Sequence, residues 1–131
     1  MKKTGLLNQP LSAAIAGLGH TDTLVIGDAG LPIPAGPQRI DLAVSAGVPP
    51  FLDVLRAVLG EMAVQGAIIA AEMESASPAM HAALRELLGG IPVEVVPHET
   101  FKARTREARA AVRTGEFTPY ANVILIAGVI F

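Results

Sequence analysis

The sequence predicts an α/β fold: a single-domain sheet with helices on both faces, spanning residues 1–131. Short runs rich in Val, Ile and Ala alternate along the chain with longer segments whose apolar residues recur at helical spacing. Glycine and proline residues mark the boundaries between these segments. Strands that alternate with helices are typical of a sheet covered by helices on both sides. The chain has no internal repeat and no linker, so we expect one domain.

Three segments have the periodicity and the end signals of helices, and a fourth, over residues 98–108, is predicted as a short polar helix without a clear apolar stripe. In the first, Asn8 is suited to cap the amino end, Pro10 lies in the first turn and Gly19 ends the helix. The second follows Pro49-Pro50 and has the clearest apolar stripe in the chain. We predict helices over residues 9–18, 51–62, 78–88 and 98–108.

The strands are predicted from short apolar runs that end at turn-forming residues. Long loops are expected over residues 27–39, which are rich in Gly and Pro, and over residues 114–122. We predict strands over residues 23–26, 40–44, 67–71, 93–96, 110–113 and 123–130. The order of these strands in the sheet does not follow from the sequence.

The composition predicts an oligomer. Hydrophobic residues make up 51% of the chain and charged residues only 17%. The longest apolar run, residues 123–131, is far shorter than the about 18 residues needed to cross a bilayer. Contact between subunits is therefore the expected way to cover the excess apolar surface.

Several classes of function are disfavoured. The net charge is −2 with no basic stripe, so we expect no nucleic-acid partner. There is no cysteine, and the three histidines lack metal-binding spacings, so we expect no metal. Nucleotide-binding and serine-hydrolase motifs are absent, and we expect no cofactor. No secretory or membrane segment is recognised at the amino end, so we expect a cytoplasmic protein without a membrane partner.

Two candidate groups flank the predicted strand 23–26. His20 follows the first helix, and Asp28 begins the Gly/Pro-rich loop. Each also has an ordinary explanation, because a His after a helix binds its last carbonyls and an Asp in such a loop stabilises a turn. As a pair they indicate proton transfer, because a carboxylate near an imidazole fixes its tautomer and raises its basicity. We therefore expect an acceptor such as Asp28 to orient His20.

Polar residues further along the chain are candidates for ligand binding. His98 follows the strand 93–96, and Lys102 lies four residues later, although this pair taken alone is better explained as part of a solvated helix face. Tyr120 and Asn122 lie in the loop 114–122, where they could simply cover a core edge and cap a turn. Together with Thr118 they also suit a polyol, because sugars need many short-range donors and acceptors.

These segments together resemble the D-ribose pyranase (ribose mutarotase) family, on the ribose branch of the RbsD/FucU group. The likeness covers essentially the whole chain, and its two long motifs are specific in combination. The Asp-Ala-Gly-Leu-Pro-x-Pro form at residues 28–34 is more similar to the ribose branch than to fucose mutarotases. The matching motifs are residues 19–22, 28–34, 61–64, 98–102 and 113–122.

The resemblance implies an enzyme that interconverts the pyranose and furanose forms of D-ribose and supplies furanose to a ribokinase. It implies a cytoplasmic ring, typically a decamer of two pentamers, with sites at subunit boundaries. By position, His20 would be the catalytic acid/base. The sugar-binding residues would be Asp28, His98, Tyr120 and Asn122, and Lys102 matches a further site position.

Three alternatives remain open from the sequence. The first is a mutarotase of another sugar, such as fucose. The second is a non-catalytic ribose-binding accessory of a transport system. The third is a structural ring whose polar loops only seal subunit contacts.

Overall fold

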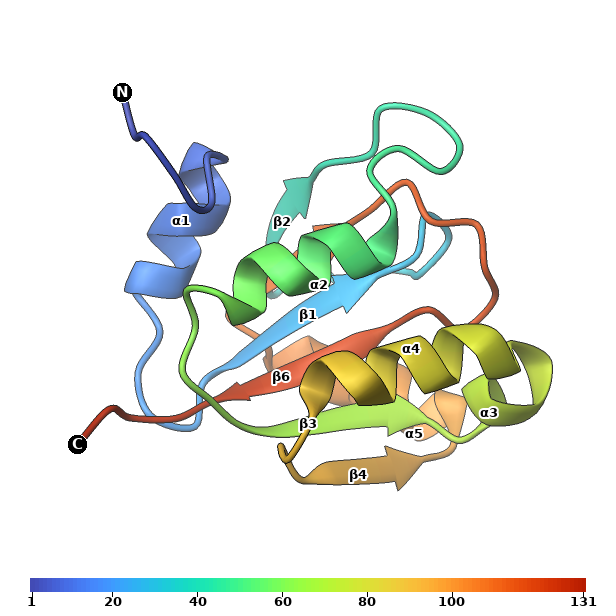
Figure 1. Cartoon of the computed structure of the whole chain (residues 1–131). Coiled ribbons are helices and arrows are strands. Elements are labelled where there is room, and N and C mark those ends of the chain that lie inside the picture. The colour runs from blue at the N-terminus through green and yellow to red at the C-terminus, as the bar shows by residue number, and fades with distance from the viewer.

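The computed structural model describes residues 1–131 as one six-stranded sheet with helices packed against it (Figure 1). The helices are α1 Gln9–Ala16, α2 Phe51–Leu59, α3 Glu72–Ala76, α4 Pro78–Leu88 and α5 His98–Arg104, with a 3-10 turn, η1, over Thr105–Glu107. The strands are β1 Thr23–Gly27, β2 Gln38–Asp41, β3 Val64–Ala70, β4 Val93–Val96, β5 Ala110–Arg113 and β6 Val123–Ala127.

The strand order, β2-β5-β1-β6-β3-β4, places β6 in the interior of the sheet. β6 is antiparallel to its neighbours β1 and β3, whereas the pairs β1–β5, β2–β5 and β3–β4 are parallel. In Figure 1 the arrowheads of β1, β3 and β4 therefore point away from the carboxyl terminus, and that of β6 points toward it. The carboxyl ends of the other five strands and the amino end of β6 lie at the same end of the sheet, which is called here the pocket edge. The opposite end, where those five strands begin, is called the far edge. Neither term refers to the edge strands β2 and β4.

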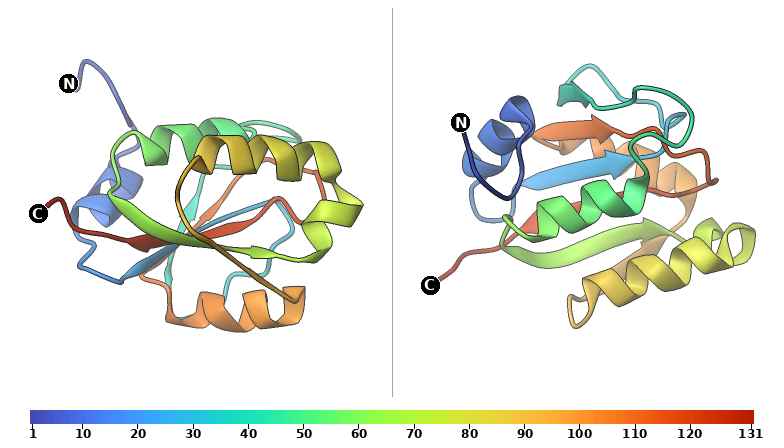
Figure 2. Two further views of the ribbon diagram at one scale, coloured as in Figure 1. Left: turned by 60° about the horizontal axis from the view of Figure 1, so that its bottom comes forward. Right: turned by 45° about the horizontal axis from the view of Figure 1, so that its top comes forward.

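Helices cover both faces of the sheet, as the sequence predicts. Figure 2 shows α2 and α4 on one face and α5 on the other. Side chains of β1 follow the period of two that this arrangement requires: Leu24 and Ile26 join the core under α2, whereas Val25 joins the core under α5. Both cores are continuous across the interior strands, and the predicted fold class is confirmed.

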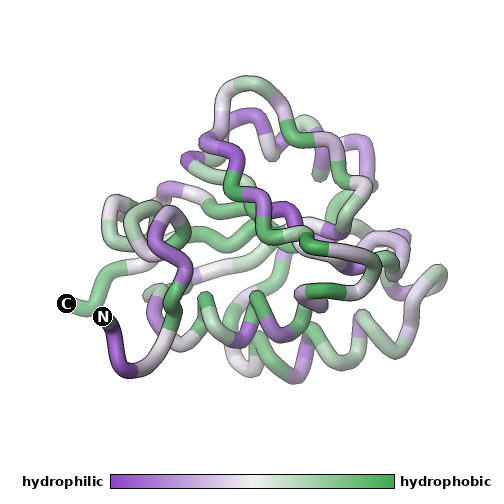
Figure 3. Tube along the Cα trace, turned by 90° about the horizontal axis from the view of Figure 1, so that it is seen from above, coloured by the Kyte–Doolittle hydropathy of each residue, from purple (hydrophilic) through white to green (hydrophobic).

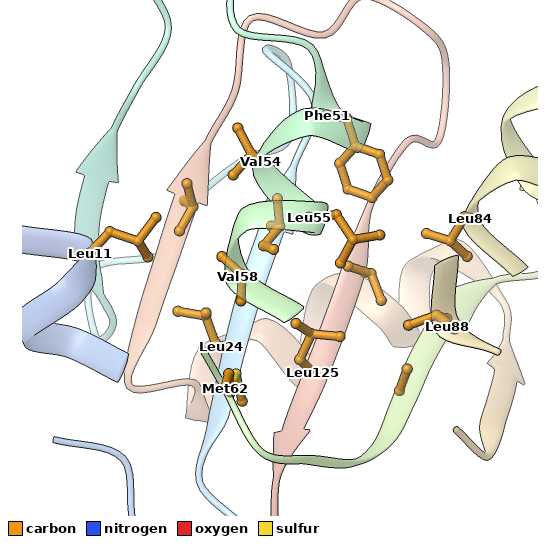
Figure 4. Packing of buried hydrophobic residues seen from close by; sticks show 14 of the residues in the cluster. Leu11, Leu24, Phe51, Val54, Leu55, Val58, Met62, Leu84, Leu88 and Leu125 are labelled. Carbon is orange, nitrogen blue, oxygen red and sulfur yellow. The ribbon is translucent and has the colours of Figure 1, made fainter. Parts of the chain in front are cut away.

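The larger core is organised around α2. Phe51, Leu55 and Val58 are fully buried and point toward β1 and β6, where Leu24 and Leu125 meet them (Figure 4). Burying such a side chain contributes about 1.5–3 kcal/mol relative to leaving it exposed. The apolar stripe read from the sequence is therefore the face that fixes α2 on the sheet.

Three predicted strands are corrected by the structure. The strand predicted over 67–71 is β3 Val64–Ala70, which begins three residues earlier because its pairing with β6 starts at Val64. The second strand is Gln38–Asp41 rather than 40–44, because pairing with β5 begins at Gln38 and the chain leaves the sheet after Asp41. The last strand ends at Ala127 rather than at 130, because its register with β3 ends there. The helix α3 was not predicted; Met73 anchors it by full burial.

The carboxyl-terminal residues after β6 are apolar and exposed. Figure 3 shows hydrophobic colour up to the carboxyl terminus. Ile130 and Phe131 are almost entirely exposed, and Phe117 near the pocket edge is 71% exposed. This surface is the kind that the composition led us to expect at subunit contacts. Among the helices, none has both the length and the apolar character needed to span a membrane.

Candidate active site

A pocket of about 290 Å³ opens at the pocket edge of the sheet. Such a volume lies near the lower limit for small-molecule sites. Four of the predicted sugar-binding residues line it: Asp28, His98, Tyr120 and Asn122. They come from three separate parts of the chain, which the mixed sheet brings together because β1 and β4 end where β6 begins.

Asp28 and Asn122 form a coupled pair at the base of the pocket. The Asn122 Oδ1 accepts from the Asp28 backbone N–H at 2.7 Å, and the Asn122 Nδ2 donates to the Asp28 Oδ2 at 2.9 Å. The Asp28 Oδ1 accepts from the Gly30 N–H at 2.9 Å. Asn122 is completely buried, and Gly27 allows it to approach, because a Cβ there would lie 3.1 Å from the Asn122 Oδ1. The Asp28 carboxylate is thereby fixed in orientation.

His98 is held at the first position of α5. Its backbone N–H donates to both carboxylate oxygens of Glu72, at 3.2 and 2.9 Å. Its ring meets the edge of the Tyr120 ring, with centroids 5.0 Å apart and planes at 86°. The His98 Nδ1 is buried and has no hydrogen-bond partner. An unpaired acceptor costs less than an unpaired buried N–H, so we infer that the proton of the neutral ring lies on Nε2.

Tyr120 has a left-handed backbone, with φ 61°, which turns its side chain toward His98. Two hydrogen bonds hold the turn. The Asn122 N–H donates to the Tyr120 carbonyl at 2.8 Å, and the buried Ser77 Oγ donates to the Pro119 carbonyl at 2.8 Å. The only phenol of the chain is therefore placed by backbone contacts, and its hydroxyl remains available to a ligand.

Glu116 connects this loop to the rest of the fold. One carboxylate oxygen accepts from the Phe51 N–H at the start of α2, at 3.0 Å. The other accepts from the N–H and the Oγ1 of Thr118, at 3.2 and 2.7 Å. Burial raises the pKa of Glu116, but the hydrogen bonds from Thr118 and Phe51 outweigh it and hold that pKa below its usual value. The segment that presents Tyr120 is thus tied to α2.

His20 lies at the opposite edge of the sheet. It precedes β1, whereas Asp28 follows it, so the whole strand separates them, about 16 Å at about 3.3 Å per residue. The expected orientation of His20 by Asp28 within one chain is therefore wrong. The His20 Nε2 instead lies 2.9 Å from the Gln65 Oε1. The His20 side chain is exposed and outside the pocket of its own chain.

Lys102 also lies outside the residues that line the pocket. It projects from α5 into a neighbouring hollow that shares Pro32 with the pocket and contains Arg106. Its Nζ is 2.7 Å from the Glu99 Oε1. This ion pair holds the pKa of Glu99 below its usual value, mainly through the hydrogen bond from Lys102.

Three residues near these groups were missed by sequence reasoning: Gln65, Glu72 and Glu116. Each bonds to a group far away in sequence, and no local pattern marks such a contact. Of the three, Glu72 was the one whose place near the pocket could be read from its position, because it follows the predicted strand 67–71 and the carboxyl ends of strands meet at the pocket edge.

The fold and this geometry define an α/β protein with a small polar pocket at the strand ends. Over residues 1–130 the chain matches the model of the RbsD / FucU transport protein family, and it belongs to that family. It is 57% identical to the D-ribose pyranase of Chloroflexus aggregans over 131 residues, 100% of each chain. It is 55% identical to that of Coprothermobacter proteolyticus over the same length and share. The predicted membership is confirmed.

Solved structures agree with this assignment. The structure of Bacillus subtilis RbsD complexed with D-ribose matches with a TM-score of 0.96 at 48% identity, covering 100% of both chains. The fucose mutarotase of Streptococcus pneumoniae, in complex with L-fucose, matches with a TM-score of 0.82 at 24% identity, covering 95% of each chain. The second likeness concerns the fold alone.

Proposed function

We propose that this chain is a D-ribose pyranase, an isomerase that interconverts the pyranose and furanose forms of D-ribose. The pyranases at 55% and 57% identity over the whole chain support this activity rather than a fucose-specific or non-catalytic one. The ribose complex of the Bacillus subtilis relative supports the sugar. Release of furanose for a ribokinase, in a cytoplasmic decamer of two pentamers, completes the proposal.

One observation supports a site shared between subunits: the pocket gathers Asp28, His98, Tyr120 and Asn122, but His20 lies at the other edge of the sheet. A head-to-tail contact between copies in a closed ring brings one subunit's far edge against the next subunit's pocket edge. The exposed apolar residues at both edges, Phe117 and Phe131 among them, support such a contact. His20 of one subunit then serves the pocket of its neighbour.

The reaction requires two proton movements. Opening the pyranose removes the proton of the anomeric hydroxyl, forms the aldehyde at C1, breaks the bond from C1 to the ring oxygen and protonates that oxygen. Closing the furanose reverses these roles, with the 4-hydroxyl attacking C1. An imidazole can accept and return protons in this way, and a positioned one typically accelerates such a step by about 10²–10⁴-fold. His20 carries this role in the proposal.

The pocket residues hold the sugar during the exchange. The Asp28 carboxylate is fixed by Asn122 and Gly30 and keeps lone pairs to accept from sugar hydroxyls. Tyr120 supplies a phenol and His98 an Nε2–H, both of which can donate to sugar oxygens. Asn122 contributes chiefly by orienting Asp28. Lys102, from the adjacent hollow, would bind the substrate at the rim of the pocket.

Exchange measured by saturation-transfer NMR on free sugars tests the function. We expect the protein to accelerate pyranose–furanose exchange of D-ribose well above the buffer rate, and to act less on L-fucose and D-glucose. Ribose binding without acceleration would instead identify a transport accessory. Stronger acceleration with fucose would identify a fucose mutarotase, and no response to any sugar would identify a structural ring. Each of these three results would overturn the proposal.

A further inference from the structure

The strand β3 contains an irregularity beside His20. Its pairing with β6 shifts register between Val64 and Gly66, so that Gln65 has no partner across the ladder. A bulge of this kind changes the direction of a side chain, and bulges are over-represented next to active sites. Here the Gln65 Oε1 comes to 2.9 Å from the His20 Nε2.

The residue that follows β6, Gly128, also makes room for Gln65. A Cβ at this position would lie 3.2 Å from the Gln65 Cβ, tighter than most such contacts. The Gly128 N–H donates to the Ala63 carbonyl at 2.8 Å, which holds the two segments together. A side chain at 128 would therefore press against Gln65, so the glycine leaves space for the Gln65 side chain.

The backbone that carries His20 is equally fixed. Thr21 has a left-handed φ of 69°, and its N–H donates to the Ala127 carbonyl at 2.9 Å. Asp22 accepts from the Gly19 N–H at 2.9 Å and is paired with Arg109, 2.9 Å away. These interactions hold the pKa of Asp22 below its usual value, chiefly through the hydrogen bond from the Gly19 N–H and then through Arg109. Asp22 and Arg109 are thus occupied with each other, and the direct partner of the imidazole is the neutral amide of Gln65.

We propose that Gln65 is a positioning residue that sets the tautomer of His20 and leaves Nδ1 as the nitrogen that exchanges protons with the sugar. The structure places the Gln65 amide with its oxygen toward the ring, and in this orientation the amide accepts and selects the ring form with the proton on Nε2. The lone pair of Nδ1, on the exposed imidazole, is then left to act as the base. This inference rests on the proposed catalytic role of His20 and adds which nitrogen acts and what holds it.

A neutral partner also suits a group that must both take and return a proton. A carboxylate at position 65 would favour the charged imidazolium, so a smaller fraction of the ring would be in the neutral, proton-accepting form at a given pH. The amide fixes the ring without adding a charge. The position therefore distinguishes two replacements, Gln65→Ala, which removes the acceptor, and Gln65→Glu, which keeps the acceptor and adds a charge.

The tautomer of His20 is measured by long-range proton–nitrogen NMR correlation, with His20→Ala identifying the signals. In the unaltered protein we expect protonated Nε2 and bare Nδ1. Gln65→Ala is expected to give a mixture of tautomers and about a 10-fold lower exchange rate for ribose, with unchanged ribose affinity. Gln65→Glu is expected to keep the tautomer and move the acid limb of the pH–rate profile upward. Gln9→Ala, at an exposed glutamine of α1, is the matched control.

Two results would overturn the inference: a proton on Nδ1 in the unaltered protein, or a Gln65→Ala protein with the same tautomer and exchange rate as before. Failure of the proposed function looks different. In that case the unaltered protein itself would not accelerate ribose exchange, and a wrong assignment of His20 would leave the His20→Ala protein active, whatever the tautomer spectra show. A general loss of structure would lower ribose affinity together with rate, which the tautomer proposal does not predict.

Discussion

Replacing His20 with alanine is expected to return ribose exchange to the buffer rate, a loss of about 10²–10⁴-fold. The assigned acid/base is removed, whereas the pocket that binds the sugar remains complete. The His20 side chain is exposed and makes one hydrogen bond, to Gln65, so the free energy of unfolding should change by less than about 1 kcal/mol. Saturation-transfer NMR on ribose measures the rate, and a ribose titration measures affinity.

The control for this variant is His81→Ala. His81 is a partly exposed histidine on α4, and it does not line the pocket. Its replacement should leave the exchange rate unchanged. If the His20→Ala protein exchanged ribose as fast as the unaltered one, another group would have to move the proton, and the assignment of His20 would be wrong.

Asn122→Asp is expected to reduce both ribose affinity and stability. The Asn122 amide donates to the Asp28 carboxylate at 2.9 Å, and an aspartate would replace that donor with a second negative charge. The position is completely buried, so the repulsion is poorly screened. Loss of a buried hydrogen bond together with an uncompensated charge should cost about 2–4 kcal/mol in the free energy of unfolding. Thermal melting and a ribose titration measure the two effects.

The pH dependence of this variant identifies the cause. Protonation of one of the two facing carboxyls restores a donor and removes the repulsion, so the deficit in stability should shrink as the pH falls toward about 4. Asn8→Asp is the control: the Asn8 Oδ1 caps α1 by accepting from Leu11 N–H at 3.0 Å, and aspartate caps equally well. An Asn122→Asp protein with unchanged melting and ribose affinity would contradict the pair's role.

The gathering of the pocket residues follows from the sequence because strand ends carry topological information. Asp28 and His98 each follow an apolar run, and the ends of parallel strands meet at one edge. The sequence does not reveal that β6 runs antiparallel between β1 and β3, which is what brings Asn122 beside Asp28. Four of the five sugar-binding residues that the resemblance implied therefore line one pocket, without Lys102, whereas their hydrogen bonds were not predicted.

The prediction that paired His20 with Asp28 failed because nearness in sequence was taken for nearness in space. Eight positions apart, the two residues lie on either side of a strand, and an extended chain carries them to opposite edges. The partner of His20 is instead Gln65, 45 residues away in the sequence. A bulge in β3 directs the Gln65 side chain toward His20, and no local sequence pattern reveals that bulge. Register shifts of this kind depend on the pairing of two strands.

Mixed assemblies test most directly whether one subunit's His20 serves the pocket of another. Chains carrying His20→Ala and chains carrying Asp28→Ala, each inactive alone, are co-assembled in equal amounts. A site formed by two neighbours is intact when an Asp28→Ala chain supplies the histidine and a His20→Ala chain supplies the pocket. About a quarter of the sites should then recover ribose exchange. Exchange that stays at the buffer rate, in rings shown by mass to contain both chains, would contradict a shared site.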